Sequence, residues 1–167
     1  MNKIKGGIIG LALAIGVSGF ANAGISIPEC DDVNGAINGA LNHIDVANHD
    51  INHVGIHRRP KQRMQLRKAI VNITGARVAL ADCGILPVRL ELEGFDFSLF
   101  DPFQVMVDLG IDVSHGNITN EHALRAARML TGHAILESYG PTDLDAKLEL
   151  HMATHLLEWV QCNVAGH

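Results

Sequence analysis

The chain has 167 residues, of which 13 are basic and 18 are acidic, so its formal net charge is −5. An acidic surface argues against nucleic-acid binding and is compatible with the binding of cations. Ten residues are histidines, whereas one Trp and one Tyr leave little aromatic surface for stacking on bases.

Residues 1–23 have the pattern of a secretory signal peptide. Lys3 and Lys5 precede an apolar run that ends in the sequence ANA, which predicts cleavage after Ala23. The run is too short to act as a membrane anchor, and no later stretch is apolar enough to span a bilayer. We therefore expect one domain, residues 24–167, in the periplasm or secreted from the cell.

Four helices are predicted from apolar residues that recur in alternating steps of three and four. The first is capped by Asp31 or Asp32 and ends before Pro60, the second ends at Gly84, the third covers roughly residues 120–138, and the fourth follows the sequence GPTD. The apolar seams consist of Val33, Ile37, Ala40, Ile44, Ala47, Ile51 and Val54; Leu66, Ala69, Ile73, Ala76, Leu80 and Cys83; Ala123, Ala127, Leu130 and Ala134; and Ala146, Leu150, Ala153, Leu157, Val160 and Val164.

Alanine recurs along these seams opposite larger aliphatic residues, which allows antiparallel helices to approach closely. The chain is thus predicted to be mainly α-helical, an antiparallel four-helix bundle built from two helical hairpins. Residues 84–118 form an insertion between the hairpins that is too long for a passive loop. Its alternating apolar and charged residues around Gly94 predict a β-hairpin or flap, and residues 103–113 are either a third strand or a short helix.

Three cysteines in an oxidising compartment predict a disulfide bond. Cys30 begins the first helix and Cys83 ends the second, at the same end of their hairpin, so these two are the first candidates. A bond between Cys83 and Cys162 is the alternative. The absence of C-x-x-C argues against a thioredoxin-type site and against c-type haem attachment.

The sequence NHIDVANHDINHVGIHRR places four candidate metal ligands, Asp45, His49, His53 and His57, on one ridge of the first helix. Since each helical residue advances by about 100°, this ridge points away from the seam into solvent. Neighbouring imidazoles one turn apart can chelate one ion, with water, another helix or another chain completing its coordination. The alternatives are a solvated polar face, or a surface that changes charge near the ordinary imidazole pKa of about 6.5.

A second cluster of candidate ligands is predicted on the last two helices. Its members are His133, His151, His155, Met129, Met152 and Glu158. Pairing around a turn near Gly140 brings His133 level with residues 148–151, so three imidazoles could converge. Imidazole with thioether suits copper, and imidazole with carboxylate suits zinc or nickel. Alternatively, the methionines fill the core and the histidines are hydrogen-bonded at its border.

Catalytic motifs are missing. The sequence HMATH lacks the glutamate of H-E-x-x-H metalloproteases, the Glu-x-x-His pattern of di-iron bundles is absent, and there is no G-x-S-x-G or P-loop. We therefore expect a protein that is not an enzyme.

Residues 41–57, with the sequence LNHIDVANHDINHVGIH, resemble the histidine- and alanine-containing helices of small periplasmic His-rich metal-binding proteins. This resemblance implies binding of several divalent metals, copper among them. The three cysteines, the Phe-rich insertion and the histidine-poor second helix depart from that family, so neither its fold nor its ligands are carried over.

Three functions are compatible with these patterns. The first is non-catalytic binding or buffering of copper, nickel or zinc in the periplasm. The second is haem binding, with His133 or His155 as one axial ligand and Met129 or Met152 as the other. The third is an interaction module in which the phenylalanines of residues 88–113 contact a partner protein. A homodimer is compatible with each of the three.

Overall fold

The computed structural model describes residues 30–52, 59–83, 100–113, 117–139 and 144–165. These ranges contain five helices: α1 (Asp31–Asn52), α2 (Arg59–Asp82), α3 (Pro102–Asp108), α4 (Asn120–Glu137) and α5 (Leu144–Ala165). The predicted signal peptide and the segment expected to form a β-hairpin, residues 88–99, lie outside the described residues. In the described ranges, every helix is too short or too polar to span a membrane.

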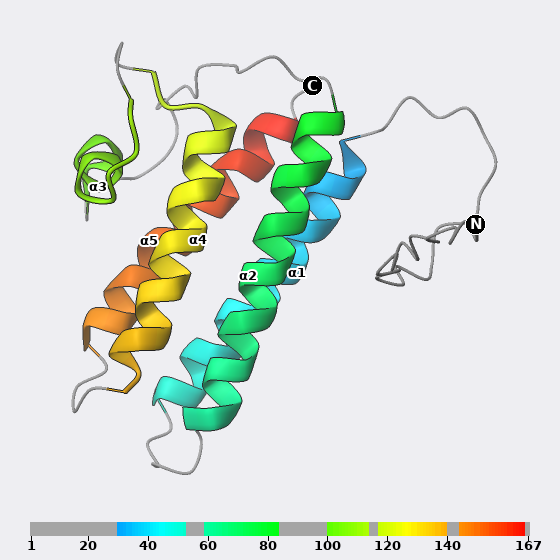
Figure 1. Cartoon of the computed structure of the whole chain (residues 1–167). Coiled ribbons are helices and arrows are strands. Elements are labelled where there is room, and N and C mark those ends of the chain that lie inside the picture. Colours follow the sequence, from blue (N-terminus) through cyan, green and yellow to red (C-terminus); the bar gives the residue numbers. More distant parts are fainter. Residues whose placement is uncertain (1–29, 53–58, 84–99, 114–116, 140–143, 166–167) are drawn as a thin grey trace, which may run out of the picture.

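The four long helices form a bundle in which neighbouring helices run antiparallel (Figure 1). Helix α1 packs mainly on α2 and α4 mainly on α5, while contacts of α2 with α4 and of α1 with α5 join the two pairs. The predicted mainly α-helical fold is confirmed, and the packing of the long helices is that of two joined hairpins.

The core consists of the predicted seams. Every aliphatic seam residue whose side chain is described is buried, and Trp159, Leu124 and Leu156 complete the interior. Burial of each Leu, Ile or Val side chain contributes about 1.5–3 kcal/mol to folding. Small residues bring α1 and α2 especially close, because a Cβ added to Gly39 would lie only 2.6 Å from Nδ2 of Asn72.

Polar contacts at both ends fix α2 against α4. At one end, Arg77 forms a bidentate ion pair with Glu121. At the other, Arg63 donates a hydrogen bond of 3.1 Å to the carbonyl of Ser138, and its guanidinium lies 3.4 Å from the ring centroid of Tyr139. Because cation–π and bidentate contacts depend on direction, they help to set the register between the hairpins.

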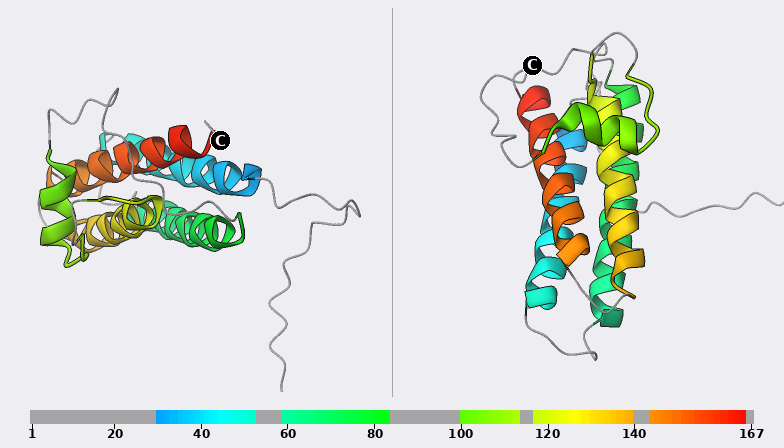
Figure 2. Two further views of the ribbon diagram at one scale, coloured as in Figure 1. Left: turned by 90° about the horizontal axis from the view of Figure 1, so that it is seen from above. Right: turned by 90° about the vertical axis from the view of Figure 1, so that its left-hand side faces the viewer.

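Residues 100–113 contain a short helix and no strand, which decides between the two alternatives for residues 103–113. Asp101 caps α3 by accepting a hydrogen bond of 2.9 Å from the Phe103 N–H, and Pro102 occupies the first helical position. After the helix, Gly110 has a φ of 66°, and Ile111 follows it into the core. Helix α3 lies crosswise over α4 and α5 (Figure 2).

One covalent bond ties the first hairpin together. Cys30 and Cys83 form a disulfide with a Cα–Cα distance of 5.5 Å, as predicted, so the alternative bond between Cys83 and Cys162 is wrong. Cys162 is exposed and outside the disulfide. The disulfide closes α1 and α2 at the end of the bundle opposite to their connection.

Candidate metal centre

Two histidines of α5 lie close enough to bind one metal ion. His151 and His155 are four residues apart, so their rings stand one helical turn above each other on the same face. Their Nε2 atoms are 3.1 Å apart, and the ring planes meet at 84°. Two imidazole nitrogens on one tetrahedral zinc, each at about 2.0–2.1 Å, are separated by about 3.3 Å. The spacing of the pair therefore suits two ligands of a single ion.

The second nitrogen of His155 faces a carboxylate. Nδ1 of His155 is 3.6 Å from Oε2 of Glu158, one turn further along α5. In metal sites, a carboxylate at the other ring nitrogen orients the imidazole and leaves the metal-binding nitrogen unprotonated. The ring of Phe100 lies 6.2 Å, centroid to centroid, from the ring of His155. An apolar neighbour and an acidic one thus both restrain the orientation of this histidine.

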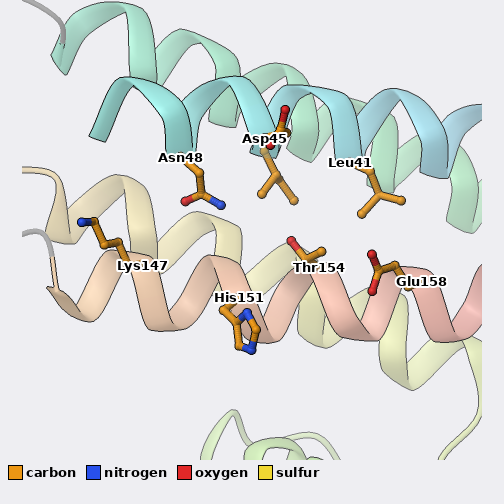
Figure 3. A pocket seen from close by; sticks show the side chains of 8 residues that line it. Leu41, Asp45, Asn48, Lys147, His151, Thr154 and Glu158 are labelled. Atoms are coloured by element: carbon orange, nitrogen blue, oxygen red, sulfur yellow. The ribbon is translucent and has the colours of Figure 1, made fainter. Parts of the chain in front are cut away.

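A cavity of about 550 Å³ lies beside the pair, between α1 and α5 (Figure 3). It is lined by Leu41, Ile44, Asp45, Asn48, Lys147, His151, Thr154 and Glu158. In Figure 3, Asn48 and Leu41 project from α1 towards α5, and Thr154 and Glu158 project back, while the ring of His151 turns to the side away from α1. Of the pair, only His151 belongs to the lining, and its ring is directed out of the cavity. The cavity brings together Asp45 and two members of the second predicted cluster, His151 and Glu158.

His133 is placed level with the beginning of α5, as its distance from the turn predicts, but it faces a carboxylate. Its Nδ1 is 3.6 Å from Oε1 of Glu149. Across the described ranges, no three His, Cys, Asp or Glu side chains are grouped so that they could hold one metal ion. The predicted convergence of three imidazoles is thus reduced, in the described structure, to the pair His151 and His155.

Glu149 is a site residue that the sequence analysis missed. Its Oε2 atom is buried and has no hydrogen-bond partner among the described residues. Burial, followed by the nearby charges of Glu137 and Asp145, raises the pKa of this carboxyl to about 7. A proton therefore binds here close to neutral pH. The only hint in the sequence was the spacing of Asp145 and Glu149, which lie one turn apart on a helix.

The ridge on α1 is described only in part. Asp45 and His49 are exposed, as predicted from the helical phase, whereas His53 and His57 lie outside the described residues. The ridge therefore stays a prediction beyond its first two members.

Two further histidines have structural roles. His43 of α1 is hydrogen-bonded through Nδ1 to Oε1 of Gln65 in α2, at 2.8 Å. His122 takes part in a capping box at the start of α4, in which the Thr119 hydroxyl accepts from the His122 N–H at 3.3 Å.

The two candidate methionine ligands pack against the hydrophobic core. Met129 and Met152 are partly buried there, where a flexible thioether fills irregular space between larger groups. This is the placement that the alternative interpretation of these residues predicted.

Comparisons of the chain with protein families, with curated proteins and with solved structures find no match. The resemblance of residues 41–57 to His-rich metal-binding proteins accordingly stays a prediction. The function must be inferred from the geometry of the chain itself.

Proposed function

We propose that this protein binds divalent transition metal ions, namely copper, nickel or zinc, in the periplasm or outside the cell, without catalysing a reaction. The observation that carries the proposal is the 3.1 Å separation of the Nε2 atoms of His151 and His155. Imidazole is a good ligand for each of these three metals. The carboxylate of Glu158 lies 3.6 Å from Nδ1 of His155, and a carboxylate on that side of the ring favours metal binding at Nε2.

The small number of protein ligands favours a role in buffering or transport of metal ions over a structural metal site. A structural zinc site has four protein ligands, whereas this pair supplies two and leaves the other positions to water or to another molecule. Such a site exchanges its metal readily. The acidic balance of the chain, −5 overall, attracts cations to the surface, and the exposed Asp45 and His49 of α1 offer a further binding position.

Haem is a weaker candidate because of where the histidines lie. The side chain of His133 is 49% exposed and pairs with Glu149, and that of His155 is 28% exposed at the outer face of α5. The proposed partners Met129 and Met152 pack against the core. The many buried alanines also bring the helices close together, which leaves little width for a planar macrocycle between them.

Calorimetric titration of tag-free residues 24–167 with copper, nickel and zinc tests the proposal. A background substitution, Cys162→Ser, removes the exposed thiol, which would otherwise bind copper. In this background, replacing both His151 and His155 by alanine should weaken the tightest site by about tenfold or more. The matched control is His133→Ala, which removes an exposed histidine of the neighbouring helix and should leave that site unchanged.

A separate variant assigns the ridge. It carries His49→Ala, His53→Ala and His57→Ala and should reduce the number of bound ions without changing the affinity of the α5 pair. Unchanged affinity and stoichiometry in both the ridge variant and the α5 variant would refute metal binding by these histidines.

A further inference from the structure

Helix α2 has an apolar stripe on the face that points away from the bundle. Its members are Met64, Val71 and Val78, which are exposed by 46%, 69% and 60%. They follow one another at intervals of seven residues, so at about 100° per residue their side chains lie within about 40° of one another. The buried Ile73 lies about 200° further round the helix than Val71, which therefore points away from the core. Apolar residues at heptad spacing are typical of a surface on which two helices pack together.

The stripe lies at a corner of the bundle. Helix α2 packs on α1 and α4 and lies diagonally opposite α5 (Figure 2). The stripe and the histidine pair of α5 are therefore on different faces of the bundle. An occupant of the stripe is independent of a metal ion on that pair.

The charges of α2 are unevenly distributed along the helix. Six of its residues are basic, and five of these lie within residues 59–68, whereas its one acidic residue, Asp82, is at the other end. Asp82 is five helical turns beyond Met64, so it lies on the same exposed face as the stripe. Two parallel copies of α2 would bring their basic ends together, where they repel. Two antiparallel copies bring the basic end of each beside Asp82 of the other and also oppose the two helix dipoles.

The stripe is symmetric about its middle residue. Met64 and Val78 are each seven residues from Val71. If two copies of α2 lie antiparallel with a twofold axis at Val71, this residue meets its own copy, and Met64 of one chain meets Val78 of the other. A twofold interface requires such self-complementarity, because the same surface serves on both sides.

The residues beside the stripe complement one another in size under the same symmetry. Arg67 and Lys68 have long, exposed side chains and lie three and four residues before Val71. Thr74 and Gly75 lie three and four residues after it and are small and exposed. Across the axis, each long side chain therefore falls opposite a small residue, which leaves room for the helices to approach.

We infer that the exposed face of α2 is the contact surface of a homodimer, in which two copies of the chain pack antiparallel around a twofold axis at Val71. An anionic membrane would also attract residues 59–68, but it would repel Asp82 on the same face. The pairing of Met64 with Val78 favours a second copy of the chain, since a lipid surface requires no such symmetry.

The strength of the dimer is limited by the small size of the stripe. Three apolar side chains from each copy form a small interface, so we expect a dissociation constant on the order of 10–100 μM. Val71→Lys places two like charges opposite each other at the axis, beside Arg67 and Lys68, and should weaken the dimer by about tenfold or more. Because Val71 is exposed in the single chain, the fold should be unaffected.

Sedimentation velocity at protein concentrations from about 1 to about 500 μM tests the inference. Residues 24–167 carry Cys162→Ser, and the buffer contains EDTA, so that neither the exposed thiol nor a shared metal ion can join two chains. This protein is compared with Val71→Lys and with the matched control Leu136→Lys, which makes the same change of charge at a residue of α4 that is 66% exposed. Circular dichroism verifies that all three remain helical.

Disulfide crosslinking tests the orientation of the two helices. In the Cys162→Ser background, the single variants Met64→Cys and Val78→Cys are mixed and oxidised, and the products are identified by mass spectrometry. The antiparallel dimer should give the mixed disulfide between the two variants in excess over either symmetric one.

A concentration-dependent dimer that is weakened by Val71→Lys but not by Leu136→Lys, together with the mixed disulfide, supports the inference. A monomer at every concentration overturns it, and binding of that monomer to phosphatidylglycerol vesicles would assign the stripe to a membrane instead. A dimer that keeps its affinity in Val71→Lys, or that links Met64→Cys mainly to itself, overturns it as well. The proposed function does not depend on any of these outcomes.

Discussion

Replacing Glu149 with glutamine should stabilise the domain above neutral pH and reduce the pH dependence of its unfolding. The carboxyl has a buried Oε2 atom without a hydrogen-bond partner among the described residues, and Glu137 and Asp145 add negative charge around it. His133 is the group that faces it from α4, 3.6 Å from Oε1. Glutamine keeps the shape of the side chain and removes its ionisation.

The sign and the size of the effect follow from the pKa of Glu149, which folding raises from 4.5 to about 7. Because the folded state holds the proton more tightly, the contribution of this group to stability is fully present below pH 4.5 and is lost as the pH rises through 7. Since one pKa unit corresponds to about 1.4 kcal/mol, the whole shift is equivalent to about 3 kcal/mol. Since 18% of the side chain remains exposed to water, we expect solvent screening to reduce it to about 1–2 kcal/mol.

Urea unfolding followed by circular dichroism, at intervals from about pH 4 to about pH 8, measures this difference. The free energy of unfolding of wild type, relative to that of Glu149→Gln, should decrease by about 1–2 kcal/mol as the pH rises from about 4 to about 8. The companion variant Glu137→Gln removes one of the charges that raise the pKa of Glu149. In that background, the stability difference between the proteins with Glu149 and with Glu149→Gln should therefore decrease less with pH than it does in wild type. A difference between wild type and Glu149→Gln that is constant with pH would refute the assignment of a raised pKa to this residue.

Three further predictions follow from the packing, the disulfide and the metal ligands. Gly75→Ala, in an open helical position, should stabilise the domain by about 0.5–1 kcal/mol. Gly39→Ala should stabilise it less, because its Cβ would displace the side-chain amide of Asn72. Thermal unfolding measures both variants, and equal shifts would contradict the close approach at Gly39. Replacing Cys30 and Cys83 by serine opens a loop with a sequence separation of 53 and should cost about 4 kcal/mol by chain entropy, which urea unfolding measures; a loss below about 1 kcal/mol would contradict that mechanism. Metal affinity measured by calorimetry should decrease from about pH 7.5 to about pH 5.5 because protons compete for imidazole nitrogens, and an affinity that does not change with pH would exclude imidazole ligands.

The helical architecture could be predicted because apolar residues recur at helical spacing within each long helix. Residues such as Ile37, Ile73 and Leu157 repeat at helical spacing, and each is fully buried in the bundle. The disulfide followed from the same regularity, since the lengths of the two helices place Cys30 and Cys83 at one end of their hairpin. The signals for α3 were present, but the alternation of apolar residues left a third strand and a short helix as equal alternatives for residues 103–113. Asp101 and Pro102 are the N-cap and first residue of a helix.

The candidate site was less predictable because it depends on how the hairpins sit against each other. Helical spacing within α5 was enough to place His151 beside His155. The spacing of residues within α1 and within α5 does not show how the two helices pack on each other. Asp45 and His151 were therefore predicted in separate clusters, although they line one cavity. The same limitation concealed Glu149. The burial of Glu149 and the nearby like charge of Glu137 on α4 are both set by packing between helices.

The placement of the disulfide determines which parts of the molecule are free to separate. Cys30 and Cys83 keep the first hairpin joined, but the walls of the cavity belong to different hairpins, α1 to the first and α5 to the second. Transient opening of the domain would therefore separate the two hairpins along non-covalent contacts and widen the cavity. A molecule bound between these walls would hold the two hairpins together. Its release would require only a brief separation of the hairpins, without unfolding of either one.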